Sequence, residues 1–224
     1  MSEEKNKSSK IPFVISTQNL GKKFSKDWLY RNFSYQFNTG NSYAVLGRNG
    51  SGKSTLLLHL ASFYGGGVGS ISYTKLGVSI NSERFYQHYA LVSPLLELPE
   101  EQQVKEFLTH FFTIKAITGN ITVSDVLEAI NLKAASDKNI KELSSGMKQR
   151  LKLAMAFYSD VPVLFLDEPC TNLDAVSINW YVETIEQIRH NKLIIVASNN
   201  PAEYTFCNER IEIERIQFKP PTIP

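Results

Sequence analysis

Residues 47–55 form a glycine-rich loop that restricts this chain to a small group of folds. Gly47, Gly52, Lys53 and Ser54 match the pattern G-x-x-x-x-G-K-[ST], in which backbone N–H groups surround phosphate oxygens. The apolar residues 42–46 before the loop suit a buried strand, and residues 55–61 after it suit a helix. Because the pattern requires a strand, a turn and a helix in this order, the sequence predicts a nucleotide-binding α/β domain.

The residue types in this loop suit a nucleotide triphosphate. Glycine keeps side chains out of the turn, so that backbone N–H groups can approach the phosphates. A helix that begins near Lys53 would direct its unpaired N–H groups and its positive dipole end toward them. Lys53 would reach the β- and γ-phosphates, and the Ser54 hydroxyl would bind Mg²⁺. The expected binding loop comprises Gly47, Arg48, Asn49, Gly50, Ser51, Gly52, Lys53, Ser54 and Thr55.

Length and composition fit one domain. The chain has 224 residues, of which 42% are hydrophobic, enough for one large α/β core with a small inserted lobe. With a net charge of only +2, the chain is not as basic as a nucleic-acid-binding domain, so no nucleic-acid partner is expected. Two cysteines, Cys170 and Cys207, make neither a disulfide framework nor a metal cluster. We expect both to be packing residues in a reducing compartment.

The ends of the chain are polar. No stretch approaches the roughly 20 apolar residues that span a bilayer, and residues 1–10 do not resemble a signal peptide. We expect a disordered tail over residues 1–10, a folded domain over 11–218 and a second tail over 219–224. A chain of this kind is expected to be cytoplasmic and to serve a membrane only by docking to another polypeptide.

Two regions differ in their hydrophobic pattern. The first 80 residues are rich in strand signals, at 12–15, 29–37, 43–46, 70–73 and 77–80. Residues 101–112 and 124–131 show helical spacing instead, with Val104, Leu108 and their neighbours Phe107 and Phe111 on one face. Ser124 with Asp125 is the expected start of the second helix.

The second half alternates between helices and apolar strands. Helices are expected over residues 145–158 and 174–190, and strands over 163–166 and 193–197. Apolar runs that alternate with helices indicate a parallel sheet covered on both faces.

Two carboxylates follow the apolar strand at residues 163–166. Ligand chemistry in α/β folds lies at the carboxyl ends of parallel strands, which is where Asp167 and Glu168 fall. Asp167 would hold Mg²⁺, directly or through water. Glu168 would orient and deprotonate the water that attacks the γ-phosphate. A solvated acidic pair is the alternative, which the nearby phosphate loop disfavours.

A second motif begins about 20 residues before this pair. The chain reads Leu-Ser-Ser-Gly-Met-Lys-Gln-Arg over residues 143–150, and this stretch resembles the signature of the ATP-binding-cassette (ABC) ATPases, Leu-Ser-Gly-Gly-Gln followed by Lys-Gln-Arg. Ser145 and Met147 are the two departures from that signature. Ser144 and the N–H of Gly146 would lie at a helix start, which is an anion-binding end.

The resemblance covers nearly the whole chain and implies several further assignments. It implies an ABC nucleotide-binding fold with a mostly parallel core sheet, an antiparallel β subdomain and a helical lobe at about residues 95–140. Ser144 and Gly146 would face the γ-phosphate held by a partner subunit, and Asp174 would communicate across that dimer. Phe24 would stack on adenine, with Trp28 and Tyr30 as alternatives, each of which could equally be a packing residue.

Two polar residues of the family pattern are absent. The family histidine after the last sheet strand is replaced here by Asn199, or by Asn200. Asparagine can bind phosphate but cannot carry a positive charge or shuttle a proton. The family glutamine at the edge of the helical lobe is replaced by Ser93 or Pro94. Losing one preorganised contact to a transition state costs about 10²–10³-fold in rate, so we expect secure ATP binding and slow hydrolysis.

The resemblance therefore implies an ATP-hydrolysing subunit of an ABC transporter, of a short export type similar to haem-exporter ATP-binding subunits. Glu168, Lys53 and Asn199 are the expected catalytic residues, with ATP and Mg²⁺ as cofactors. The expected partners are a transmembrane permease subunit, on the inner face of the cell membrane, and a second ATP-binding subunit, identical or different. The alternatives are a non-transport ATP switch and a slow structural subunit paired with a more active one.

Overall fold

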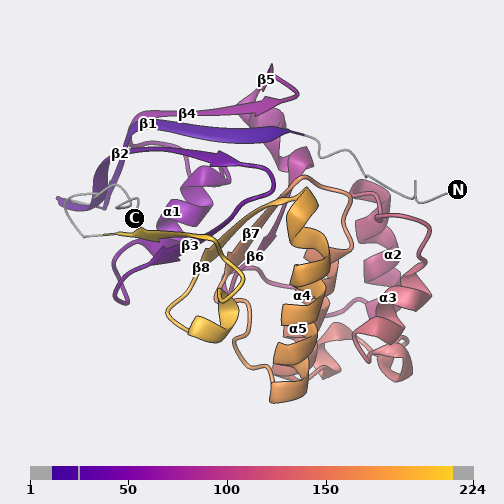
Figure 1. The fold of residues 1–224 in the computed structure, drawn as a ribbon. Coiled ribbons are helices and arrows are strands. Elements are labelled where there is room, and N and C mark those ends of the chain that lie inside the picture. Colours follow the sequence, from indigo (N-terminus) through magenta and orange to yellow (C-terminus); the bar gives the residue numbers. More distant parts are fainter. Residues whose placement is uncertain (1–11, 25, 214–224) are drawn as a thin grey trace, which may run out of the picture.

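The computed structural model describes residues 12–24 and 26–213, with the side chain of Phe24 excluded. Two sheets organise this part of the chain (Figure 1). An antiparallel sheet has the strand order β2-β1-β4-β5, and a parallel sheet has the order β6-β7-β8-β3-β9. The strands are β1 (Phe13–Phe24), β2 (Asp27–Asn38), β3 (Ser42–Leu46), β4 (Val68–Lys75), β5 (Val78–Ile80), β6 (Tyr89–Val92), β7 (Val163–Asp167), β8 (Leu193–Ala197) and β9 (Glu209–Glu212).

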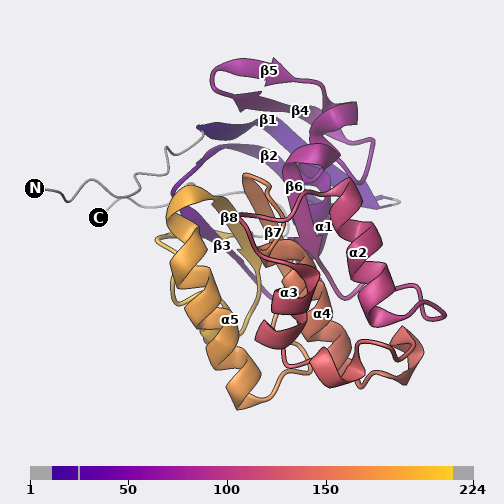
Figure 2. The same ribbon diagram turned by 90° about the vertical axis from the view of Figure 1, so that its right-hand side faces the viewer.

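The parallel sheet is covered on both faces, as its apolar strands predict. Alternate residues of β7 and β8 enter two different cores: Val163 and Phe165 pack on one face, Leu164 and Leu166 on the other. The α-helices of the described residues are α1 (Lys53–Leu60), α2 (Val104–Ile114), α3 (Val123–Ala129), α4 (Ser145–Phe157) and α5 (Ala175–Ile188). Figure 2 shows α4 and α5 on one side of the parallel strands, and their apolar faces form the second core with Leu164 and Leu166.

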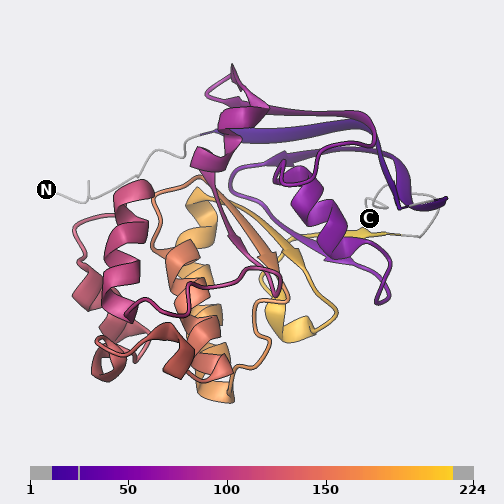
Figure 3. The ribbon, with the colours of Figure 1, turned by 180° about the vertical axis from the view of Figure 1, so that it is seen from behind.

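Helix α1 lies between the two sheets. Seen from behind, it lies below the antiparallel strands and beside the parallel ones (Figure 3). Leu56, Leu57 and Leu60 are fully buried and share one core with residues of β1, β2, β4, β7 and β8. This packing fixes the amino end of α1, and with it the phosphate loop, at the carboxyl edge of the parallel sheet.

The helices α2 and α3 form a third core with one face of α4. Val104 and Leu108 are fully buried there, and Phe107 and Phe111 pack against them, as the helical spacing predicts. The predicted start of α3 at Ser124 is wrong, because Thr122 is the cap. The Thr122 side chain accepts from the Asp125 N–H, and the Asp125 carboxylate accepts from the Thr122 N–H in return. Similarly, α2 begins at Val104 rather than at residue 101.

The strands at the two ends of the domain differ from those predicted. β1 and β2 each extend over 12 residues, longer than predicted, and the short strand β9 lies outside the predicted strands. Cys170 and Cys207 are free thiols in or against the second core, as expected. The predicted tails, 1–10 and 219–224, lie outside the described residues. Within the described ranges, no helix has the length and apolar character needed to cross a membrane.

Candidate functional site

The phosphate loop joins β3 to α1, as the sequence predicts. Gly50 and Gly52 have φ angles of 77° and 101°, values that L-residues with side chains rarely adopt. A methyl group at Gly50 would meet no atom within 4 Å, so the backbone there is open to a ligand. Gly52 is the residue before α1, and the unpaired N–H groups of the first helical turn follow it. The loop therefore offers the open, positively polarised turn that a phosphate chain requires.

Lys53 is held inside this loop. Its Nζ donates to the carbonyl oxygens of Gly47 at 2.9 Å and Arg48 at 3.2 Å, and its side chain is buried. Burial lowers the pKa of Lys53, while the charges of Glu168 and Asp167 oppose that shift. A phosphate group would supply the full negative charge that two carbonyl dipoles replace only in part.

Asp167 connects the phosphate loop to β7 and to the segment after β6. Its Oδ1 accepts from Ser54 Oγ at 2.9 Å, and its Oδ2 accepts from Ser93 Oγ at 3.2 Å. The carboxylate is only 2% exposed, and burial raises its pKa against the lowering effect of both hydroxyls. A cation near the carboxylate would offset this desolvation.

These donors fit Mg²⁺. The Ser54 hydroxyl and the Asp167 carboxylate are the hard oxygen ligands that this ion prefers. Ser54, which is hydrogen-bonded to Asp167, lines a cavity of about 360 Å³ together with Leu29, Asn49, Gly50, Gly52, Lys53, Thr55 and Glu168. In addition, the buried hydroxyl oxygen of Ser51 has no hydrogen-bond partner in the described part of the chain. The loop thus retains polar groups whose partner would come with a ligand.

Glu168 lines the same cavity. Its side chain is exposed, and its φ angle of 45° is strained for a residue with a side chain. The Glu168 N–H donates to the Ala197 carbonyl of β8 at 2.9 Å. This bond turns the chain out of β7 and places the carboxylate beside Lys53 and Ser54, where a general base for an attacking water would stand.

Asn199 meets the phosphate loop from the other side. Its Nδ2 donates to Asn49 Oδ1 at 2.7 Å, although 150 residues separate the two. Asn200, the alternative, instead caps the short turn η5 (Pro201–Glu203) by accepting from the Ala202 N–H. Pro94 is exposed, whereas Ser93 is buried against Asp167. Of each alternative pair, Asn199 and Ser93 are the residues that the fold brings to the site.

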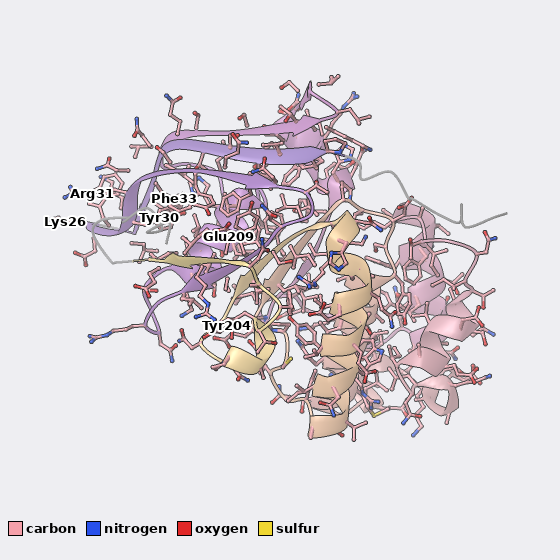
Figure 4. The ribbon with its side chains drawn as sticks, viewed as in Figure 1. Lys26, Tyr30, Arg31, Phe33, Tyr204 and Glu209 are labelled. Atoms are coloured by element: carbon pink, nitrogen blue, oxygen red, sulfur yellow. The ribbon has the colours of Figure 1, made fainter. Side chains whose placement is uncertain are left out.

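The three aromatic residues predicted as alternatives for stacking on adenine, Phe24, Trp28 and Tyr30, lie in different surroundings. Tyr30 is wrong as an adenine-stacking residue, because it is 2% exposed and its hydroxyl pairs with His59 Nδ1 at 2.9 Å. Figure 4 labels Tyr30 on β2, at the side of the antiparallel sheet. Trp28 is half-buried with Lys23 Nζ 5.6 Å from its ring, and the side chain of Phe24 lies outside the described residues. Leu29, which sequence reasoning missed, is the β2 residue that lines the cavity.

Ser144 and Gly146 lie at the amino end of α4. Ser144 is exposed and caps the helix by accepting from the Met147 N–H at 3.3 Å. A methyl group at Gly146 would lie 2.8 Å from the carbonyl oxygen of Asn172, so only glycine allows α4 this close to the segment after β7. Asp174 caps α5 through the Ser177 N–H at 2.8 Å. None of the three lines the cavity of the phosphate loop.

Comparisons with known proteins agree on one family. The model of the family described as "ABC transporter" matches residues 30–171. A Nod factor export ATP-binding protein I of Burkholderia lata is 34% identical over 83% of this chain and 62% of its own length. ABC transporter A family member 7 of Dictyostelium discoideum is 28% identical over 78% of this chain, which spans only 21% of that protein. An uncharacterized ABC transporter ATP-binding protein of Bacillus subtilis is 28% identical and covered over 92% of its length.

Solved structures share the fold. An ATP-binding subunit of an ABC transporter superposes with a TM-score of 0.79 at 20% identity, over 92% of this chain and 88% of that one. A bacterial Atm1-family ABC exporter with ATP bound superposes with a TM-score of 0.78 at 16% identity, over 93% of this chain and 38% of that one.

Proposed function

The chain belongs to the ABC transporter family, and on this premise we propose that it is an ATP-binding and ATP-hydrolysing subunit that drives a separate transmembrane subunit. One observation carries the hydrolytic part of the proposal. Glu168 lines the same cavity as Lys53 and Ser54 in the described structure, so a candidate general base faces the groups that would hold the γ-phosphate.

Different residues of the chain would bind ATP and hydrolyse it. Lys53 and the loop N–H groups would hold the phosphates, and Ser54 with Asp167 would hold Mg²⁺. That ion, when bound, offsets the charge of the β- and γ-phosphate oxygens. Glu168 would take the proton of the attacking water. Asn199 would contact the γ-phosphate with a neutral amide, which supports slow hydrolysis.

Two copies would complete each ATP site. Ser144 and Gly146 lie outside the cavity of their own phosphate loop, at an exposed helix end that suits an anion. We infer that they face the ATP bound by a second ATP-binding subunit, identical or different. Closure of this pair around ATP would act on the membrane subunit, at the inner face of the cell membrane, because ATP binds the closed state more tightly.

The names of the relatives support a role in transport. Named relatives include Nod factor export and lantibiotic transport ATP-binding proteins, and on that basis we place this chain with transport rather than with translation or DNA maintenance. Purification of the tagged chain from detergent-solubilised membranes tests this. A polytopic membrane protein is the expected companion, whereas recovery of ribosomes or DNA instead would contradict transport.

The hydrolytic part of the proposal is tested by Glu168→Gln. The variant keeps the shape of the side chain and loses the base, so the Kd for Mg-ATP should stay within about threefold. Turnover should fall at least about 100-fold. Calorimetry measures the first and phosphate release the second, in the complex with the membrane partner. Glu183→Gln, an exposed residue of α5, is the matched control and should behave as the wild type. Equal turnover of wild type and Glu168→Gln would rule out the hydrolytic role.

A further inference from the structure

Glu203 is a buried carboxylate outside the nucleotide cavity. It ends η5 and is only 3% exposed. Its Oε1 accepts from the Cys170 N–H at 2.9 Å, and its Oε2 has no hydrogen-bond partner within the described residues. Burial raises the pKa of Glu203, while the nearby Ser198 hydroxyl and the Cys170 N–H lower it. Burying a carboxyl group with so few partners is costly, so packing alone does not account for it.

The segment that Glu203 contacts comprises Glu168, Pro169 and Cys170. Each of its three residues is held by a different element. The Glu168 N–H bonds to Ala197 at the end of β8, and the Pro169 carbonyl accepts from Gln149 Nε2 of α4 at 2.7 Å. The Cys170 N–H is held by Glu203. A backbone with the strained φ of Glu168 persists only where its surroundings determine it in several places.

Glu203 is itself fixed in place. The Tyr181 hydroxyl, fully buried on α5, donates to the Glu203 carbonyl at 2.8 Å. Figure 4 labels the next residue, Tyr204, beside the short turn that follows β8. The same loop begins with Ser198 and Asn199, so its two ends reach different groups. Asn199 contacts the phosphate loop, and Glu203 contacts the segment after Glu168.

We propose that Glu203 is a positioning residue, which ties the loop of Asn199 to the segment of Glu168 and thereby holds the two side chains in register across the cavity. The proposal rests on the proposed function, because it assigns Glu203 a part in the hydrolysis of ATP. Glu203 does not touch the cavity lining and acts through the backbone of Cys170. Misplacing a catalytic group by about 1 Å can cost as much as 10²-fold in rate.

Glu203→Met and Glu203→Gln test this in the full chain with its membrane partner. Methionine fills the space without an acceptor, whereas glutamine keeps a carbonyl oxygen for the Cys170 N–H. We expect Glu203→Met to lower kcat at least about tenfold with KM within about twofold, because the phosphate loop is untouched. Glu203→Gln should stay within about threefold of the wild type. Glu183→Gln again controls for the loss of an acidic charge.

A second measurement does not depend on turnover. In a Cys207→Ser background, the buried Cys170 thiol should react with a maleimide at least about tenfold faster in Glu203→Met than in the wild type or Glu203→Gln. If Glu203→Met fails to fold, Glu203→Asp withdraws the acceptor by one methylene, and a three- to tenfold loss of kcat is expected. Mass spectrometry of the labelled peptide measures the rate at which Cys170 reacts with the maleimide.

The outcomes separate the two proposals. Unchanged kcat and unchanged Cys170 labelling in a folded Glu203→Met protein would overturn the positioning role. So would a parallel loss of Tm and a rise of KM in both Glu203 variants, which would indicate a general structural role. If the wild type itself does not bind Mg-ATP, the proposed function fails, and the labelling rates still decide whether Glu203 holds the segment.

Discussion

Asn199 takes the place of a histidine in the family pattern that the sequence resembles, and it differs from histidine in that it cannot become charged. Its side-chain amide lies against Asn49 of the phosphate loop at 2.7 Å, where the described structure has a neutral hydrogen bond. An amide donates hydrogen bonds but stays uncharged, whereas a histidine can become a cation. Hydrogen bonds from a charged donor to phosphate are roughly twice as strong as those between neutral groups. If Asn199 contacts the γ-phosphate as we propose, its neutral amide would stabilise the developing charge there less well than an imidazolium would.

Asn199→His should raise turnover. We expect an increase of about tenfold in kcat at pH 6.5–7, since an added imidazolium would contact the transition state. Phosphate release by the complex measures it. The matched control is Asn200→His, which should give no gain and removes the cap of η5. A rate for Asn199→His equal to or below that of the wild type would show that position 199 does not contact the γ-phosphate.

Among the elements, α4 connects the most parts of the site. Its first turn presents Ser144, its middle holds the Pro169 carbonyl through Gln149, and Lys152 Nζ donates to the Ser93 carbonyl at 3.4 Å. Ser93 in turn holds Asp167. A displacement of α4 would therefore act on both Asp167, at the end of β7, and Glu168, which follows it.

The start of β8 depends on a buried lysine. Lys192 Nζ donates to the carbonyls of Ser159 at 3.1 Å and Val161 at 2.6 Å, which joins the start of β8 to the segment before β7. Burial lowers the pKa of Lys192 to about 8 from an ordinary 10.5, although Asp160 opposes the shift. Between these two values the unfolded chain binds a proton that the folded protein has released, so the contribution of Lys192 to stability rises with pH.

Lys192→Met should make this contribution visible. The free energy of unfolding of the wild type, relative to the variant, should rise between pH 8 and pH 10 by at most about 3 kcal/mol. Chemical denaturation at a series of pH values measures the free energy of unfolding of both proteins. Taking the difference between them cancels the titration of the groups that both proteins share. Lys105→Met, at an exposed site on α2, is the matched control for the loss of a lysine charge. A pH-independent difference for Lys192→Met would mean that Lys192 keeps its ordinary pKa.

On the scale of the whole molecule, the proposed function assigns the two halves of an ATP site to different surfaces. The loop cavity contains Lys53 and Glu168, and the exposed cap of α4 contributes nothing to its lining. A second copy that supplied its own Ser144 would bring a helix amino end to the phosphates. Association should therefore depend on bound nucleotide and on the surface around Ser144.

We expect Glu168→Gln to dimerise in the presence of Mg-ATP, so that size-exclusion chromatography with light scattering measures twice the molar mass of the nucleotide-free protein. Added to this variant, Ser144→Arg should prevent the doubling while leaving the Kd for ATP within about threefold, because a large side chain would block the facing subunit. Thr109→Arg on α2, also exposed, is the control and should still dimerise. Dimers that persist with Ser144→Arg would contradict the proposed facing surface.

The phosphate loop and the alternation of the core strands could be predicted because their physical requirements are local. The four fixed positions of the loop require particular residue types within a span of eight residues, and buried parallel strands require continuous apolar runs. For the same reason the sequence predicts Asp167 and Glu168 at the carboxyl end of a strand and Ser144 at the start of a helix, which is where the structure has them. The family that these motifs resemble is the one whose model matches the chain.

Tertiary structure alone decided which residues meet. Ser93 lies 74 positions from Asp167 and Asn199 lies 150 from Asn49, and their contacts follow from the strand order β6-β7-β8-β3-β9. All these strands share one side-chain period, so the sequence does not reveal which are neighbours. Tyr30 could not be told from an adenine-stacking residue, since an aromatic side chain suits a core and a base equally. Glu203 belongs to no motif that the sequence reveals, and its contact with Cys170 is possible because β7 and β8 end side by side, so that the segments after them start close together.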